Sequence, residues 1–284
     1  MNKIYYGVEI QYSKENYEGI YNLLYFEGIN TILEENGIIK FYLEDKDFQK
    51  LEQLKKSFLK LPSLSEKNIH IEKLENHDWN LEWEKSIDPV YIKDRIIVYP
   101  SWKKNELIEY KDRILIEIDP KMSFGTGHNE TTQLMLEMMC DFIDENDKYL
   151  LDYGCGTAVL AIAGIKLGIE KAVAIDIDED SIINAEEYIG KNGVSANIKL
   201  YKANIEEINE SGFDVIVSNI DRTVIVGNVK TINSKLKPNG KLFITGILIE
   251  EEQKIKAALN THNFELIDMK NKTEWLAFYA RKIL

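Results

Sequence analysis

The spacing of apolar and polar positions in the first part of the chain predicts a small unit of mixed helices and strands. Asn36-Gly37 is a two-residue hairpin signal, and Asp47 is suited to cap a helix. Strands are expected at 4–12, 31–35, 38–43 and 69–74, and helices at 14–26 and 47–60. This β-α-β-β-α-β order is the ferredoxin-like arrangement. We therefore expect an α+β domain over residues 1–75, which suits either a structural or a recognition module.

A polar, charged segment over residues 76–89 separates this unit from the rest of the chain. It contains Trp79 and Trp83, whose four-residue spacing puts both rings on one face of a helix. Packing of that helix on a domain and contact with a substrate both fit this pattern. We expect a helical linker that leads into a second domain over residues 90–284.

The second part of the chain alternates strands with helices. After two extended stretches at 90–99 and 113–118, strands are expected at 149–153, 172–177, 198–201, 213–218, 242–245, 264–269 and 275–280. Helices are expected at 134–142, 159–167, 179–191, 223–236 and 250–260. Such alternation predicts a parallel sheet covered by helices on both faces. The last two strands are joined by a short loop and should be antiparallel, which favours a methyltransferase-type sheet over a dinucleotide fold.

The composition narrows the function classes. With 35 basic and 48 acidic side chains, the 284-residue chain carries a net charge of −13. Tight binding to bare nucleic acid is therefore not expected, whereas a basic protein partner suits this charge. No apolar run reaches the length of a membrane span or a signal peptide. The spacing of two cysteines and four histidines predicts neither a metal site nor a disulfide, and we expect a cytoplasmic protein.

The sharpest chemical signal is a glycine motif between a predicted strand and a predicted helix. It runs from Leu150 to Thr157 and contains Asp152, Gly154 and Gly156. The two glycines allow a tight turn and close approach of a ligand. Val159 stands where a dinucleotide fingerprint has its third glycine, which argues against a pyrophosphate. The motif suits either a simple tight turn or the cationic end of S-adenosylmethionine, with Asp152 facing the ammonium or sulfonium directly or through water.

Polar residues at the ends of the next strands extend this signal. Asp176 ends the second strand, where an acid can accept both ribose hydroxyls. Ile177 follows it and is suited to cover an adenine face, while Asp178 is suited to cap the next helix. Asn204, after the third strand, suits either the adenine edge or a turn. Asn219, after the fourth strand, suits a turn or the binding of a substrate amine through its carbonyl oxygen.

The chain resembles the ribosomal protein L11 methyltransferases (PrmA type) in several segments. The segments are DPKMSFGTGHNETT, LLDYGCGTAVLAIAGIKLG, AIDIDEDSI, VSNI and LKPNGKLFITGIL. The resemblance extends from about Trp79 to residue 284, and the expected N-terminal unit matches the family's substrate-recognition domain in kind and position. The FGTG…TT loop is specific to this family and its near relatives, whereas the GCG motif alone indicates only a class I methyltransferase.

The resemblance implies a Rossmann-like, seven-stranded sheet with an antiparallel last strand, and S-adenosylmethionine as methyl donor. It implies methylation of lysine side chains on a large-subunit ribosomal protein, with the N-terminal amine as a second candidate. The family's cofactor positions fall on Thr132, Gly154, Asp176 and Asn219. The family loop contains Phe124, Gly125, Thr126 and Gly127, which we expect to fold over the donor.

Three departures from the family pattern stand out. Asn129 replaces a common histidine, and Ala158 and Lys121 each replace a frequent glycine. The change at Ala158 is expected to be mild if the backbone there is helical, because alanine is the better helix former.

Three other readings compete with a protein methyltransferase. An RNA or DNA amino-group methyltransferase would use the same donor domain, but the net charge of −13 counts against it. Val159 and the terminal antiparallel pair count against a nicotinamide-dependent oxidoreductase. A non-enzymatic interaction protein would not need Gly154, Asp176 and Asn219 together.

Overall fold

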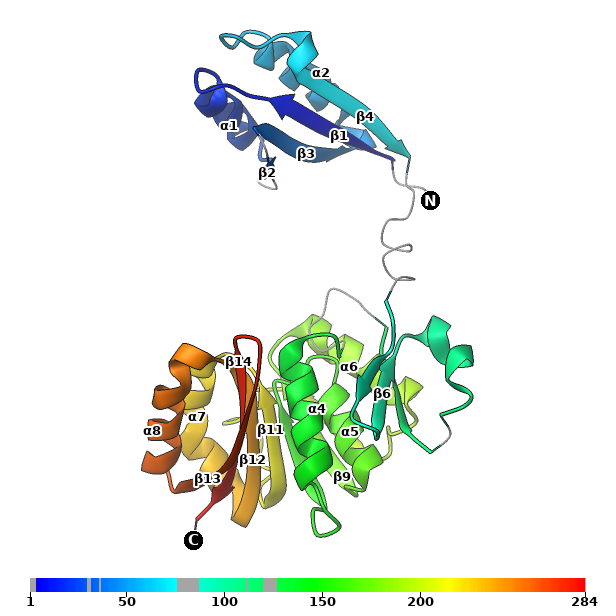
Figure 1. Ribbon diagram of the computed structural model, residues 1–284, viewed down its shortest axis with the longest axis vertical. Coiled ribbons are helices and arrows are strands. Elements are labelled where there is room, and N and C mark those ends of the chain that lie inside the picture. Colours follow the sequence, from blue (N-terminus) through cyan, green and yellow to red (C-terminus); the bar gives the residue numbers. More distant parts are fainter. Residues whose placement is uncertain are drawn as a thin grey trace. The chain divides into compact units, whose positions relative to one another are not determined.

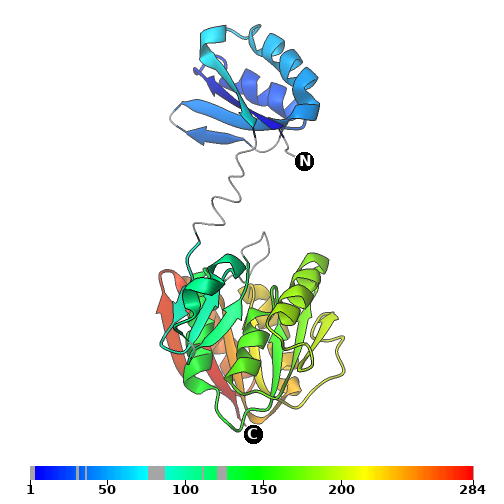
Figure 2. The same ribbon diagram turned by 90° about the vertical axis from the view of Figure 1, so that its right-hand side faces the viewer.

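A computed structural model describes residues 4–29, 32–35, 37–75, 87–110, 112–119 and 127–283 (Figures 1 and 2). The chain divides into two compact units, Met1–Trp83 and Glu84–Leu284. The predicted linker helix with Trp79 and Trp83 lies outside the described residues. Within the described residues, no helix is long and apolar enough to cross a membrane.

The first unit has the predicted ferredoxin-like order of elements. Its elements are β1 (Ile4–Gln11), α1 (Tyr17–Phe26), β2 (Leu33–Glu35), β3 (Ile38–Glu44), α2 (Phe48–Phe58) and β4 (Ile69–Glu75). The antiparallel sheet has the order β2-β3-β1-β4. Alternate residues of β1 and β3, such as Val8, Ile10 and Phe41, form its core with residues of both helices.

Two local predictions in this unit need correction. Helix α1 begins at Tyr17 rather than near residue 14, because the side chain of Asn16 accepts a 2.8 Å hydrogen bond from the Ser13 N–H and holds a turn there. Asp47 occupies the N-cap position of α2 as expected, but its side chain makes no capping hydrogen bond.

The second unit is built on a seven-stranded sheet. Its strands are β8 (Tyr149–Tyr153), β9 (Lys171–Asp176), β10 (Ile198–Lys202), β11 (Phe213–Asn219), β12 (Leu236–Leu248), β13 (Phe264–Lys272) and β14 (Trp275–Lys282). Their order is β10-β9-β8-β11-β12-β14-β13. Strand β14 lies between β12 and β13 and is antiparallel to both, as the short connection predicts. The strand order reverses between β8 and β11, which is where open α/β sheets bind ligands.

Helices cover both faces of this sheet (Figure 1). They are α4 (Glu130–Phe142), α5 (Val159–Leu167), α6 (Glu179–Lys191), α7 (Arg222–Lys235) and α8 (Glu252–Thr261). Residues of α4, α5 and α6 share one apolar cluster with Leu150 and Ala172, and residues of α7 and α8 share another with Leu151 and Val173. Neighbouring strand residues therefore point to opposite layers, as the two-residue period of a strand requires.

A three-stranded sheet precedes the main sheet in the chain. It consists of β5 (Val90–Ile92), β6 (Ile96–Tyr99) and β7 (Ile114–Glu117), and a 3-10 helix, Ser101–Leu107, follows β6. The single extended stretch expected at 90–99 is wrong, because the backbone turns at Lys93, whose φ is 49°. Strands β5 and β6 therefore pair as an antiparallel hairpin, and β7 adds to β6 in parallel.

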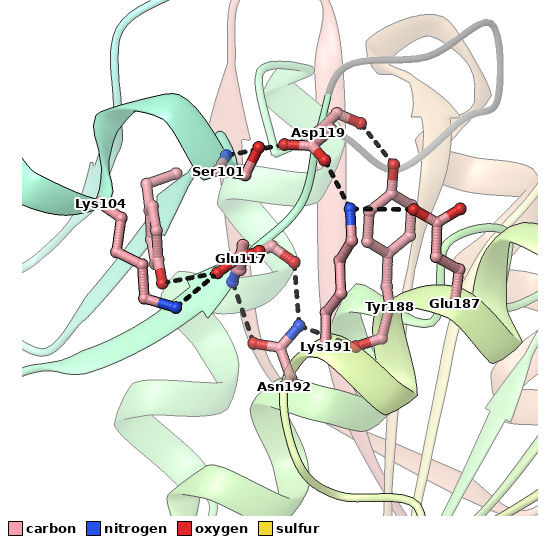
Figure 3. Close-up of polar contacts among 9 residues, drawn as sticks. Ser101, Lys104, Glu117, Asp119, Glu187, Tyr188, Lys191 and Asn192 are labelled. Atoms are coloured by element: carbon pink, nitrogen blue, oxygen red, sulfur yellow. Dashed lines mark hydrogen bonds and ion pairs between the residues drawn. The ribbon is translucent and has the colours of Figure 1, made fainter.

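Polar contacts tie the end of β7 to the last turn of α6 (Figure 3). The side-chain amide of Asn192 donates to the Glu117 carbonyl and accepts from the Glu117 N–H, both at 2.9 Å. The Asp119 carboxylate pairs with Lys191 at 2.7 Å, and the Tyr188 hydroxyl donates to the Asp119 carbonyl at 2.8 Å. The small sheet is thereby fixed to the helix that begins beside the carboxyl end of β9.

Candidate active site

A cavity of about 540 Å³ opens at the carboxyl ends of β8, β9 and β10. We call it the glycine-turn cavity. Four residues expected to bind a cofactor line it: Gly154, Asp176, Ile177 and Asn204. The other lining residues come from the same strand ends and from the β11–α7 segment: Tyr153, Ala203, Ile220, Thr223, Val224 and Asn228. Residues far apart in the sequence thus meet at one edge of the sheet.

The glycine motif forms a tight turn between β8 and α5. Gly154 and Gly156 have φ values of 76° and 53°, in the left-handed region that favours glycine. The N–H groups of Gly154 and Cys155 both donate to the Ile175 carbonyl at 2.9 Å. A Cβ at Gly154 would lie 2.2 Å from Cγ2 of Ile220, so only glycine allows this approach.

The backbone at Ala158 is not helical, so the condition under which alanine would be a mild change is not met. Ala158 has φ 60° and ψ 22°, in the left-handed region immediately before α5. Its N–H donates to the Cys155 carbonyl at 2.7 Å, which closes the turn. Left-handed backbone costs an L-residue roughly 1–2 kcal/mol. The position therefore favours glycine, and alanine is the strained residue rather than the better one.

Asp176 is fixed at the end of β9 by two backbone groups. Its Oδ2 accepts from the Gly156 N–H at 2.9 Å, and its Oδ1 accepts from the Asp178 N–H at 3.0 Å. Each carboxylate oxygen retains a lone pair for a further donor. Ile177 is 72% exposed on the cavity wall, and Asp178 caps α6 by accepting from the Ser181 N–H, which confirms that interpretation.

Asn204 forms a turn after β10, which was one of its two predicted roles, and it also lines the glycine-turn cavity. Its Oδ1 accepts from the Tyr153 hydroxyl at 3.1 Å and from the Ile205 N–H at 2.7 Å. Its side-chain carbonyl is therefore occupied by the protein itself. The amide NH₂ is the group that remains for a ligand in the glycine-turn cavity.

Asp152 is fully buried and lines neither of the cavities described here. Its Oδ2 accepts from the Ala161 N–H at 2.9 Å, while its Oδ1 has no partner among the described residues. Burial raises the pKa of Asp152 to about 7, and repulsion from the Asp176 carboxylate adds to this effect. The Ala161 N–H acts in the opposite direction. The carboxyl group is therefore poised between its neutral and charged forms near neutral pH.

A second cavity, of about 470 Å³, adjoins the end of β11. We call it the Asn219 cavity. It is lined by the first turn of α4, the residues after β11, and the strands β12 and β14: Asn129, Glu130, Thr131, Asn219, Ile220, Asp221, Gly246 and Trp275. The Asn219 NH₂ group donates to the hydroxyl oxygens of Thr131 and Thr132, both at 3.3 Å. Its carbonyl oxygen has no partner among the described residues and is available to a donor in the cavity.

The expected site residues fall into three groups. Gly154, Asp176, Ile177 and Asn204 line the glycine-turn cavity, whereas Asn219 lines the neighbouring one. The buried Thr132 holds Asn219, and the buried Asp152 and the turn residue Gly156 support the glycine motif. Phe124, Gly125 and Thr126 lie outside the described residues.

Ile220, Gly246 and Trp275 are among the lining residues that the sequence patterns did not single out. Gly246 lies at the carboxyl half of β12, and a glycine within an apolar strand is a signal of close backbone approach. Trp275 begins β14 and pairs with Leu248 of β12. No local pattern marks Trp275, because its place depends on that long-range antiparallel pairing.

Three features of the second unit are those of class I methyltransferases: the strand order, the reversed strand β14, and a glycine turn beside a strand that ends in an acidic residue. The chain belongs to the ribosomal protein L11 methyltransferase (PrmA) family, whose model matches residues 5–283. It is therefore a methyltransferase.

Curated relatives and a solved structure agree with this assignment. A ribosomal protein L11 methyltransferase of Clostridium botulinum is 30% identical over 267 residues, which cover 90% of this chain and 83% of that protein. One of Brevibacillus brevis is 32% identical over 255 residues, covering 87% and 81%. The crystal structure of a ribosomal protein L11 methylase from Lactobacillus delbrueckii subsp. bulgaricus has a TM-score of 0.64 and 27% identity, and covers 69% of this chain and 100% of that one.

Proposed function

We propose that this enzyme transfers methyl groups from S-adenosylmethionine to lysine side-chain amines of ribosomal protein L11, with the N-terminal amine as a second acceptor. The observation that carries the proposal is Asn219, whose side-chain carbonyl has no partner among the described residues and which lines a cavity next to the glycine-turn cavity. A carbonyl oxygen at that place accepts a hydrogen bond from an amine and directs the nitrogen lone pair away from itself.

The glycine-turn cavity suits S-adenosylmethionine in size and chemistry. Asp176 offers carboxylate lone pairs to ribose hydroxyls, Ile177 offers an apolar surface to adenine, and Asn204 offers its amide NH₂ to the adenine edge. The buried Oδ1 of Asp152, which has no partner among the described residues, adds negative potential near a cationic donor when the carboxyl group is ionised. In this proposal Phe124, Gly125 and Thr126 cover the donor.

The protein's part in the reaction is to bind and orient the acceptor and to favour its neutral form. S-adenosylmethionine supplies a methyl group on a sulfonium, which leaves as a neutral thioether while the amine nitrogen takes the methyl. A lysine amine has an ordinary pKa of about 10.4 and must first lose a proton to water. The indole of Trp275 and the side chain of Ile220 lower its pKa by desolvation, and Asn219 then holds the neutral amine. We expect no obligate general base.

The choice of acceptor rests on the names of the relatives and on charge. Both relatives described above carry the name of the ribosomal protein they methylate. The net charge of −13 suits a basic protein and disfavours direct binding to nucleic acid. In this proposal residues 1–75 recognise the ribosomal protein, residues 76–89 link the two domains, and residues 90–284 bind the donor and transfer the methyl group.

Mass spectrometry of ribosomal protein L11 after incubation with enzyme and S-adenosylmethionine tests this function. We expect mass increases in steps of one methyl group on lysine-containing peptides. Asn219→Ala should lower turnover by about 100-fold, because the amine loses its alignment. Asn146→Ala, which changes an exposed asparagine remote from both cavities, is the matched control and should leave turnover unchanged. Unchanged L11 alongside methylated ribosomal RNA would instead support the amino-group RNA methyltransferase.

A further inference from the structure

Ile220 lies where the two cavities meet. Among the described residues that line them, Ile220 is the one common to both. It directly follows Asn219, the residue that we propose holds the amine. Any group that passes between the two cavities therefore passes beside Ile220.

Two glycines from different strands hold this isoleucine. A Cβ at Gly154, after β8, would lie 2.2 Å from Cγ2 of Ile220. A Cβ at Gly246, in β12, would lie 2.4 Å from the Ile220 carbonyl oxygen and 3.0 Å from its carbonyl carbon. Both glycines have positive φ, at 76° and 85°. One glycine thus lies close to the Ile220 side chain and the other close to its backbone, so a side chain at either glycine would displace Ile220.

Ile220 is also suited to its place by its own chemistry. A β-branched side chain has few accessible χ1 rotamers, so its position is sharply defined. It has no polar group that competes with Asn219 for an amine or with Asp176 for a ribose. The result is a rigid apolar partition between a donor cavity and an acceptor cavity.

We propose that Ile220 is a positioning residue that sets the line of methyl transfer between donor and amine. The inference rests on the proposed function, and deepens it. As the methyl leaves sulfur and bonds to nitrogen, the three atoms must stay in line, and a displacement of about 1 Å can cost about 100-fold in rate. The Ile220 side chain limits sideways motion of both reactants, and its backbone, fixed by Gly246, fixes Asn219.

The experiment compares Ile220→Ala with a conservative variant and a matched control. We expect Ile220→Ala to lower kcat by about 100-fold while the Kd for S-adenosylmethionine stays within about threefold. Ile220→Val keeps the β-branch but loses one methyl group, and should lower kcat by about three- to tenfold. Ile183→Ala makes the same chemical change at a residue on α6 that is 57% exposed and lines neither cavity, and should leave kcat unchanged.

Two results would overturn the proposal: a native kcat for Ile220→Ala, or a loss of rate that is matched by a loss of donor binding. If Ile220→Ala does not fold, as judged by circular dichroism, Ile220→Val decides alone. It should then show a lowered kcat with native donor affinity, and a native kcat would refute the partition. If the native enzyme leaves L11 unmethylated, the proposed acceptor is wrong, and the same variants are compared with polylysine as acceptor.

Discussion

The buried carboxyl group of Asp152 gives the most specific prediction about stability. Asp152→Asn keeps the shape of the side chain and an oxygen that can accept a hydrogen bond from the Ala161 N–H. It removes the ionisable carboxyl group. Burial raises the pKa of Asp152 to about 7 from an ordinary 3.8. Because one pH unit of pKa corresponds to 1.36 kcal/mol, this change corresponds to roughly 4 kcal/mol.

The sign of the effect follows from proton binding. Between pH 3.8 and about 7 the folded state binds more protons at Asp152 than the unfolded state does. The contribution of Asp152 to stability is therefore fully present below pH 3.8 and is lost as the pH rises through about 7. Relative to the native enzyme, Asp152→Asn should become more stable by roughly 4 kcal/mol between about pH 4 and pH 8.

Urea denaturation of both proteins across this pH range measures the difference. Asp144→Asn is the control. The hydrogen bond from Lys241 lowers the pKa of Asp144 to about 2, so its contribution is lost only as the pH falls through about 2. The Asp144 side chain is 52% exposed, so we expect a small, constant offset of about 1 kcal/mol or less between pH 4 and 8. Parallel pH profiles for the native enzyme and Asp152→Asn would refute the reasoning.

Three further predictions concern the glycine turn and the charge. Gly154→Ala and its control Gly193→Ala both place alanine at positive φ, and each should lower the free energy of unfolding, measured in urea, by about 1–2 kcal/mol. Only the new Cβ of Gly154→Ala clashes with Ile220, so only this variant should also lose donor binding in calorimetry. Equal donor affinity of the two variants would contradict this reasoning. Ala158→Gly should change stability by less than about 1 kcal/mol, since relief of strain offsets the lost methyl, whereas Ala163→Gly inside α5 should cost about 2 kcal/mol. Stopped-flow association with L11 should slow as salt rises, and a salt-independent rate would argue against electrostatic steering.

Much of the second unit was predictable because its signals are local. Buried apolar runs ended by Asp176 or Asn219 identify parallel strands, and the carboxyl ends of parallel strands meet at one edge. That rule alone brings residues some forty positions apart into one site. The antiparallel terminal strand followed from a connection too short for a helix.

The failures have equally specific causes. Alanine carries no signal of left-handed backbone, so the strain at Ala158 was invisible in the sequence. The hairpin at Lys93 was missed because a lysine at positive φ is not a usual turn residue. Ile220 and Trp275 were missed because their roles depend on which strands lie together, and spacing along the chain does not contain that information.

The position of β14 inside the sheet has a consequence for how the two cavities form when the enzyme folds. The described residues that line the glycine-turn cavity lie between Tyr153 and Asn228 in the sequence. Trp275, which lines the Asn219 cavity, lies in β14, the last described strand of the sheet. Only when β14 inserts between β12 and β13 does the Asn219 cavity gain its indole wall. Because a domain generally folds as a unit, the pairing of β14 completes the sheet and this cavity together. Closure of the Asn219 cavity therefore depends on a long-range strand pairing that the described wall of the glycine-turn cavity does not include.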